Sequence, residues 1–317
     1  MNPERLKLTI DSIAIEAQDI AVLRLFNANG APAPNFSAGS HIDLHLDNGL
    51  TRSYSLLNPS EDGRVLTIAV QREPASRGGS VFVHDSLKAG DSIYASTPRN
   101  NFELNEQAPY SILIAGGIGV TPLIAMAHRL EQLNKPWRLY YCARNRHHAL
   151  INRLPNAPQN IIFNFDQEPG STLLDIKSVM DSADENTHFY CCGPISMMQA
   201  FLRSGGQKPP EFLHVEYFSA QQVQQAGPSR DFEVVLAKSG RTLTVGRDTT
   251  ILEALIDDGF ELSYSCMEGV CGSCETEVLE GEPDHRDLIL SAADRKSGRT
   301  MMICCSGSKT PRLVLNL

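Results

Sequence analysis

The first hundred residues alternate between short apolar runs and turn-forming residues. Within each run, apolar and polar positions alternate with a period of two, and Gly, Pro, Asn and Asp separate the runs. This pattern predicts an antiparallel barrel or sandwich. Helical spacing is scarce here; the exception is residues 80–88, with Val81, His84 and Leu87 on one face. The apolar runs cover residues 6–15, 41–46, 52–57 and 65–71.

The pattern changes at residue 110. A strand over residues 111–115 leads into a glycine-rich loop, and a helix follows as far as Leu133. Further apolar strands then alternate with helix-like stretches, which predicts a parallel sheet with crossover helices, the architecture of a nucleotide-binding domain. These strands cover residues 138–142, 161–165, 188–192 and 212–217.

A polar, glutamine-rich stretch over residues 219–229 ends in Gly-Pro-Ser, as a flexible interdomain linker does. Two strands at 232–237 and 242–245 and a helix at 250–258 follow it. We therefore predict a multidomain fold: an antiparallel β-barrel domain, an α/β parallel-sheet nucleotide domain, a linker and a C-terminal α+β domain. Their predicted boundaries are 1–105, 106–220, 221–230 and 231–317.

Composition agrees with a multidomain globular chain. A chain of 317 residues is too long for one ordinary core, and its 42% hydrophobic and 21% charged residues are typical of folded proteins. The formal charge of −9 argues against nucleic acid as the main partner, because phosphate binding needs clustered Lys and Arg. The charged start is unlike a secretory signal, and no apolar stretch is long enough to span a bilayer. We expect a cytoplasmic protein without a membrane partner.

The negative charge is concentrated near the end of the chain. From Asp231 onward there are 15 acidic and 9 basic residues. This excess suggests a basic docking partner, or it reflects an ordinary solvated surface.

Four cysteines carry the chemistry of the last domain. Cys266, Cys271 and Cys274 form C-x4-C-x2-C, and Cys304 follows after 29 residues, which is the plant-type [2Fe-2S] spacing. Nearby glycines and serines let backbone amides approach the sulfurs. The alternatives are a structural zinc site, for which two C-x2-C pairs would be usual, and Cys305 as the fourth ligand.

The order of barrel, nucleotide domain and ferredoxin-like domain resembles the phthalate dioxygenase reductase family across nearly the whole chain. That family includes the reductase components of vanillate demethylase, phenoxybenzoate dioxygenase and carnitine monooxygenase. Residues 282–287 and 312–317 also look like the family, although its members commonly have Asp where Asn316 stands.

Two segments of the first domain are candidate flavin ligands. Arg52, Ser53, Tyr54 and Ser55 match the R-x-Y-S motif of the ferredoxin reductase superfamily: the tyrosine offers a flat face to the flavin, the arginine meets a phosphate and a hydroxyl reaches the N5 region. An ordinary strand carrying Arg and Tyr is the alternative. The second segment opens the predicted helix, and the resemblance implies that it binds the FMN phosphate; a plain glycine turn capped by Ser80 is its alternative. Its residues are Arg77, Gly78, Gly79 and Ser80.

A glycine-rich loop is the candidate site for the nicotinamide cofactor. Residues 116–122 read GGIGVTP between a predicted strand and a helix, where a dinucleotide pyrophosphate binds. The candidates are Gly116, Gly117 and Gly119, with Thr121 expected to cap the helix and Pro122 to occupy its first position. A purely structural turn is the alternative.

Further candidates lie at the ends of later strands. Cys192, Gly193 and Pro194 resemble the family's C-G-P motif beside the nicotinamide, and Phe218 matches an aromatic residue that stacks near the flavin. Arg144 or Arg146, just after a strand, could accept a 2′-phosphate, and no acid lies between residues 140 and 148. The resemblance nevertheless points to NADH as the donor.

The resemblance implies the reductase component of a two-component Rieske-type oxygenase. Electrons would pass from NADH through FMN, with FAD as the less favoured flavin, to a [2Fe-2S] cluster and on to the terminal oxygenase. No side chain is assigned as a catalytic acid, base or nucleophile, and the family suggests a monomer. A different acceptor, such as a ferredoxin or cytochrome, and a non-catalytic redox sensor are the alternatives. An aromatic acid or a quaternary amine such as carnitine remains open as the oxygenase substrate.

Overall fold

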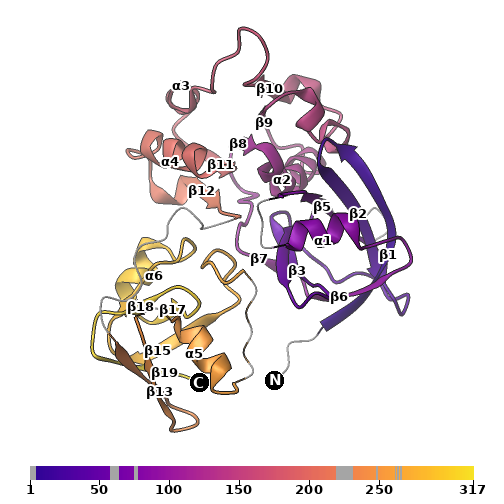
Figure 1. The fold of residues 1–317 in the computed structure, drawn as a ribbon. Coiled ribbons are helices and arrows are strands. Elements are labelled where there is room, and N and C mark those ends of the chain that lie inside the picture. Colours follow the sequence, from indigo (N-terminus) through magenta and orange to yellow (C-terminus); the bar gives the residue numbers. More distant parts are fainter. Residues whose placement is uncertain are drawn as a thin grey trace. The chain divides into compact units, whose positions relative to one another are not determined.

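The computed structural model describes residues 5–57, 64–74, 78–218, 231–247, 249–260, 262, 264 and 266–317. The chain divides into two compact units, Met1–Glu216 and Tyr217–Leu317. The first unit contains an antiparallel and a parallel sheet, and the second contains a smaller mixed sheet (Figure 1). The predicted linker, residues 221–230, and Arg77 lie outside the described residues.

An antiparallel sheet opens the first unit. Its strand order is β4-β3-β6-β1-β2-β5, with β7 paired to β3, and the helix α1 (Gly79–Asp85) follows β5. An isolated bridge between Leu56 and Ile68 joins the two ends of this order, so the sheet closes into a barrel. The strands are β1 (Arg5–Ala17), β2 (Ile20–Asn27), β3 (Ser40–His45), β4 (Thr51–Ser55), β5 (Val65–Gln71), β6 (Ser92–Ser96) and β7 (Arg99–Asn100).

A parallel sheet of order β10-β9-β8-β11-β12 completes the first unit. Its central strands are buried almost throughout, because helices cover both faces: α2 lies on one side, and α3 and α4 on the other (Figure 1). The strands are β8 (Tyr110–Gly116), β9 (Trp137–Ala143), β10 (Ile161–Phe165), β11 (Thr187–Cys192) and β12 (Leu213–Glu216). The helices are α2 (Val120–Gln132), α3 (Ile176–Asp181) and α4 (Ile195–Ser204), with short 3-10 turns at Gly117–Gly119, Arg146–His148, Ile151–Arg153, Pro158–Asn160 and Pro210–Phe212.

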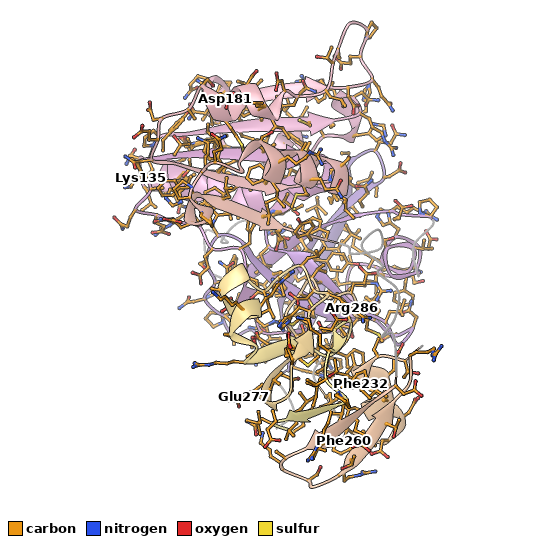
Figure 2. The ribbon with its side chains drawn as sticks, turned by 90° about the vertical axis from the view of Figure 1, so that its left-hand side faces the viewer. Lys135, Asp181, Phe232, Phe260, Glu277 and Arg286 are labelled. Carbon is orange, nitrogen blue, oxygen red and sulfur yellow. The ribbon has the colours of Figure 1, made fainter. Side chains whose placement is uncertain are left out.

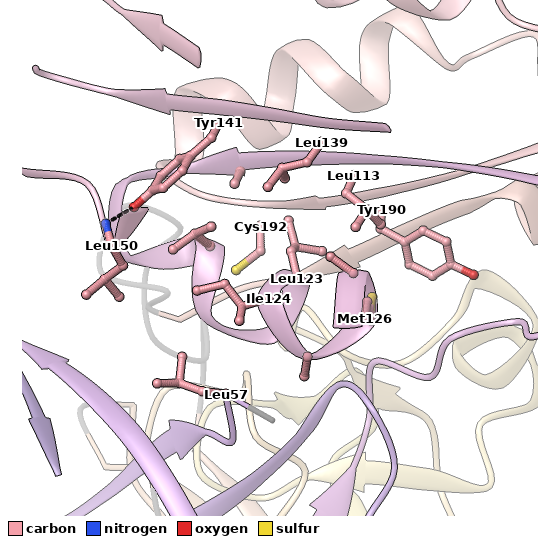
Figure 3. Close-up of a cluster of buried hydrophobic side chains, with 14 of the residues drawn as sticks. Leu57, Leu113, Leu123, Ile124, Met126, Leu139, Tyr141, Leu150, Tyr190 and Cys192 are labelled. Atoms are coloured by element: carbon pink, nitrogen blue, oxygen red, sulfur yellow. Dashed lines mark hydrogen bonds between the residues drawn. The ribbon is translucent and has the colours of Figure 1, made fainter. Parts of the chain in front are cut away.

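The core beneath the parallel sheet extends to its carboxyl edge. Leu123, Ile124 and Met126 of α2 pack with Tyr190 and Cys192 of β11 in one buried cluster (Figure 3). Packing of α2 against β11 thus positions the loops at the ends of these strands.

The second unit has the sheet order β14-β13-β19-β15-β17 and a separate β16-β18 pair. Its hydrophobic core contains Phe232, and Phe260 packs against that core (Figure 2). The strands are β13 (Phe232–Leu236), β14 (Thr242–Val245), β15 (Glu275–Glu280), β16 (Pro283–Asp284), β17 (Thr300–Met302), β18 (Gly307–Ser308) and β19 (Arg312–Leu315), and the helices are α5 (Ile251–Asp257) and α6 (Ala292–Ser297).

The predicted fold class is confirmed: an antiparallel barrel, a parallel α/β sheet and a C-terminal α+β unit. Strands β2 and β6 were not among the predicted runs, and β12 is shorter than residues 212–217 because a 3-10 turn occupies Pro210–Phe212. The predicted boundary at 105/106 falls between β7 and β8 and stays a prediction.

Candidate functional site

Arg52 brings the two candidate flavin segments together. Its side chain lies directly on the backbone of Gly79, where a Cβ atom would come within 2.8 Å of both its Cγ and its Nε. A larger residue at this position would force the Arg52 side chain to shift. The guanidinium group and the start of α1 therefore converge on one place, although they are far apart in the sequence.

The helix start itself differs from the alternative in which Ser80 caps it. Gly78, with φ of 91°, is the N-cap residue of α1, and no side chain caps the helix. The hydroxyl of Ser80 instead accepts a hydrogen bond from the backbone N–H of Glu73 at 3.0 Å. Ser80 thereby ties the start of α1 to the segment that follows β5.

Side chains of β4 alternate between two faces, so Arg52 and Tyr54 share one face and Ser53 and Ser55 the other. Burial raises the pKa of Tyr54 to about 12, which keeps its phenol neutral. The hydroxyl of Ser53 donates to Asp43 Oδ1 at 2.6 Å. Tyr54 is thus suited to stacking, whereas the described contact of Ser53 is structural.

Glu216 is a functional candidate that sequence reasoning missed. This last residue of β12 is paired in register with Cys192 of β11, and the Ser55 hydroxyl donates a hydrogen bond to its buried carboxyl group. Burial raises the pKa of Glu216 to about 8, and its Oε2 has no hydrogen-bond partner among the described residues. Its place two residues before Phe218, at the end of a predicted strand, was the available signal.

Replacing Glu216 with glutamine should reduce the loss of stability between about pH 4.5 and pH 8. Unfolded Glu216 ionises near its ordinary pKa of 4.5, whereas folded Glu216 stays protonated up to about 8. The stabilisation is therefore complete below the lower pKa and is lost as the pH rises through the higher one. We expect the free energy of unfolding to differ between the variant and wild type by on the order of a few kcal/mol across this range. Unfolding can be followed through the fluorescence of Trp137, the chain's single tryptophan.

Glu185→Gln is the matched control, because Glu185 is exposed and lies in the same unit. It should keep the wild-type pH dependence. An identical pH profile for Glu216→Gln and wild type would show that Glu216 does not titrate in this range.

The glycine loop and the C-G-P segment pack against each other. A Cβ atom on Gly119 would lie 2.4 Å from the carbonyl oxygen of Cys192, and one on Gly116 would lie 2.5 Å from Cδ of Pro194. A Cβ atom on Gly193 would lie 3.0 Å from the backbone N and Cα of Gly116. The structure therefore joins the two candidate nicotinamide segments at the carboxyl edge of β8 and β11, where ligands bind in open α/β sheets.

Gly117 meets a different requirement. Its φ is +56°, in the left-handed region, and a Cβ atom there would have no heavy atom within 4 Å. Glycine is therefore favoured here by backbone conformation. The space beside it is open, as an approaching ligand requires.

The predicted capping role of Thr121 is wrong. The 3-10 turn at Gly117–Gly119 runs directly into α2, so Gly119 is the N-cap and Thr121 lies inside the first turn. Its hydroxyl donates to the carbonyl of Ile118 at 3.0 Å. Pro122 is accordingly the third residue of α2, not the first.

Three other positions lie around the sheet edge or beyond it. Arg144 is exposed just after β9, and its carbonyl accepts from the backbone N–H of Gln167 at 2.9 Å. The backbone N–H of the neighbouring Asp166 donates to the carbonyl of Ala143 at 3.1 Å, which places an acid beside this strand end.

Phe218 belongs to the second unit and is 43% exposed, so its role beside the flavin stays a prediction.

The four predicted cysteine ligands interact through their side chains. The side chains of Cys271 and Cys304 hydrogen-bond to the sulfur of Cys266 and lower the pKa of its thiol, and Cys304 also hydrogen-bonds to Cys274. The backbone N–H of Glu268 donates to Cys266 Sγ at 3.3 Å. Four neighbouring sulfurs with backbone amides directed at them have the donor set that a [2Fe-2S] cluster requires.

Cys305 is placed differently from Cys304. Its sulfur lies on the backbone of Gly269, where a Cβ atom would approach it to 2.5 Å, and it contacts the Met302 carbonyl at 3.7 Å. Cys304 is the one whose thiol bonds to both Cys266 and Cys274. This arrangement favours Cys304 as the fourth ligand.

Comparison with known proteins agrees with these sites. Residues 234–308 match the 2Fe-2S iron-sulfur cluster binding domain family. Phenoxybenzoate dioxygenase subunit beta of Ectopseudomonas oleovorans is 46% identical over 98% of this chain and 97% of its own length. Tetrachlorobenzoquinone reductase of Sphingobium chlorophenolicum is 42% identical over 98% and 97% of the two chains.

A solved structure extends the match to the whole fold. Phthalate dioxygenase reductase, described as a modular structure for electron transfer from pyridine nucleotides to [2Fe-2S], superposes with a TM-score of 0.74 at 35% identity, covering 99% of this chain and 98% of that one. The chain belongs to the phthalate dioxygenase reductase family. It is an oxidoreductase that passes electrons from a reduced pyridine nucleotide through a flavin to a [2Fe-2S] cluster, as the reductase of an oxygenase system.

The described part of the chain has no helix that is long and apolar enough to cross a membrane.

Proposed function

We propose that this chain is the NADH-dependent, FMN-containing reductase of a two-component Rieske-type oxygenase. The observation that carries the proposal is the convergence of separate motifs: Arg52 lies on Gly79, and the loop at Gly119 packs on Cys192. Residues that are remote in the sequence thereby form one flavin site and one nucleotide site. The second unit adds four interacting cysteines.

The residues fit the groups assigned to them. Arg52 and the Gly78–Ser80 segment would hold the flavin phosphate, with Tyr54 against the ring and Ser55 at its polar edge. The unpartnered Oε2 of Glu216 offers a further polar contact beside Ser55. When bound, the flavin accepts hydride and releases single electrons to the cluster. The protein's own contribution is alignment and exclusion of water.

The nucleotide would lie along the edge formed by Gly116, Gly117 and Gly119. Burial raises the pKa of the Cys192 thiol well above its usual value, so this side chain stays neutral and uncharged beside the nicotinamide. We propose NADH as the donor because Asp166 supplies, from the next strand, the acid that the segment after β9 lacks. A carboxylate binds a ribose diol and repels a 2′-phosphate; kcat/KM should therefore favour NADH over NADPH, and the opposite preference would assign Arg144 to a 2′-phosphate.

The terminal oxygenase is proposed as the acceptor because the most similar relatives include an oxygenase subunit. Tetrachlorobenzoquinone reductase, at 42% identity, shows that a family member can be named for a quinone instead. Titration of the reduced protein with a purified Rieske oxygenase and with a benzoquinone would distinguish these acceptors. Faster reoxidation by the quinone would contradict the proposal.

An absorption spectrum with iron, sulfide and flavin analysis, before and after anaerobic addition of NADH, tests the cofactors. We expect about two irons and two sulfides per chain, together with FMN, and bleaching of the spectrum by NADH. FAD in the extract would overturn the choice of flavin. Zinc without flavin would overturn the proposed function as a whole.

A further inference from the structure

A segment without cysteines supports both stretches that supply the cluster ligands. We call residues 283–290 the bracing segment and residues 266–274 the cluster loop. The backbone N–H of Leu288 donates to the carbonyl of Gly269, inside the cluster loop, at 2.9 Å. On its other side, β16 pairs with β18, just after Cys304, and the backbone N–H of Arg286 donates to the Ser306 hydroxyl at 3.2 Å.

Asp287 shapes the bracing segment. This residue is only 1% exposed, and its Oδ1 accepts hydrogen bonds from the N–H groups of Ile289 at 3.1 Å and Leu290 at 2.8 Å. Its backbone carbonyl accepts from Arg295 Nη2. A buried aspartate that satisfies two backbone donors fixes the local turn, because leaving these donors unpaired is costly.

The charge of the Asp287 carboxylate is partly balanced by Arg295, whose Nη2 lies 3.6 Å from Oδ1. His285 Nδ1 lies 3.8 Å from Oδ2, but burial lowers the pKa of this histidine, so its ring adds little positive charge at neutral pH. These distances are longer than close ion pairs, and the site is shielded from water. The carboxylate therefore makes an electrostatic contribution in addition to its hydrogen bonds.

Gly269 is the residue of the cluster loop that packs directly on Asp287. Its φ is +71°, and a Cβ atom there would lie 3.0 Å from Cα of Asp287 and 2.5 Å from the sulfur of Cys305. The loop backbone at Gly269 is thus packed between the backbone of Asp287 and the side chain of Cys305, both from outside the cluster loop. The preceding residue, Glu268, donates its N–H to Cys266 Sγ, so a shift of Gly269 moves an amide that contacts a ligand sulfur.

We propose that Asp287 is a positioning residue for the [2Fe-2S] cluster. It holds the turn that presses on Gly269, and through Gly269 it sets the amides and sulfurs of the cluster loop. Because hydrogen bonds to the sulfurs and nearby charge set the potential of such clusters, Asp287 also influences the potential. The inference rests on the proposed ligands Cys266, Cys271, Cys274 and Cys304.

Two variants separate anchoring from charge. Asp287→Ala removes the acceptor for both backbone N–H groups, so we expect loss of most of the bound iron, while reduction of the flavin by NADH continues. Asp287→Asn keeps an acceptor oxygen but removes the negative charge. It should retain iron and show a cluster midpoint potential shifted to more positive values, with an altered electron paramagnetic resonance spectrum.

Asp257→Asn is the matched control, since it makes the same change of charge at an exposed position of α5. It should keep the wild-type iron content, potential and spectrum. Wild-type values of all three in both Asp287 variants would overturn the inference. A wild-type protein without any iron-sulfur spectrum would instead overturn the proposed ligand set, so the two failures are distinguishable.

Discussion

Replacing Cys274 with serine is expected to abolish NADH-dependent reduction of cytochrome c and leave direct reduction of the bound flavin by NADH intact. The Cys274 sulfur is buried and hydrogen-bonded to Cys304, in the group assigned to the cluster. Cytochrome c accepts single electrons, so its reduction depends on the cluster. We expect the rate of cytochrome c reduction to fall by more than about 100-fold. Substitution of residues that only contact the ligands of a metal site already costs about 10–100-fold in activity, and Cys274 is itself a proposed ligand. Stopped-flow absorbance separates the two steps.

Cys305→Ser is the control for this experiment. Cys305 neighbours Cys304 in the sequence, but its sulfur lies against Gly269 and the Met302 carbonyl. Most of the cytochrome c activity should remain in Cys305→Ser and disappear in Cys304→Ser. The reverse result would make Cys305 the ligand, and loss of flavin reduction in a folded Cys274→Ser protein would contradict the proposed electron path.

Replacing Gly119 with alanine is expected to damage the nucleotide site severely. The added Cβ atom would lie 2.4 Å from the Cys192 carbonyl oxygen, and a backbone group in a buried strand cannot rotate away. The loop must move instead, at a cost of about 1–3 kcal/mol in the free energy of unfolding. Displacement of a binding loop by about 1 Å can reduce kcat/KM for NADH on the order of 100-fold. Thermal unfolding and steady-state kinetics measure both effects.

Gly206→Ala is the corresponding control in the same unit. Its nearest contact would be the Arg203 carbonyl at 3.4 Å, an ordinary van der Waals distance. This variant should match wild type in both measurements. Wild-type kinetics for Gly119→Ala would show that the contact between the glycine loop and the C-G-P segment does not organise the nucleotide site.

Local pattern was sufficient for much of the fold because its signals are short-range. Alternation with a period of two identified β1, β3, β4 and β5, and the strand–glycine–helix order identified β8 and α2. The spacing of Cys266, Cys271, Cys274 and Cys304 identified the cluster type, since a loop of fixed length must wrap the irons. These features depend on neighbours within a few residues or on simple spacing.

Thr121 shows where local reasoning fails. A threonine followed by proline is a good helix start, and the sequence contains no sign that a 3-10 turn at Gly117–Gly119 already begins the helix. Gly119 of this turn packs on the Cys192 carbonyl, a contact between segments that are far apart in the sequence. Tertiary packing therefore decided which residue caps α2.

The sequence by itself determined the order of the domains, the residue types at each cofactor site and the ligand spacing of the cluster. Only the tertiary structure decided which groups meet: Arg52 with Gly79, Ser55 with Glu216 and Asp287 with Gly269. Such pairs depend on how strands and loops from distant segments pack, and burial then changes their chemistry. Asp287 looks like an ordinary acid in the sequence, and Glu216 is distinguished there only by its place at the end of a predicted strand, because the surroundings that enclose each carboxyl group come from distant segments.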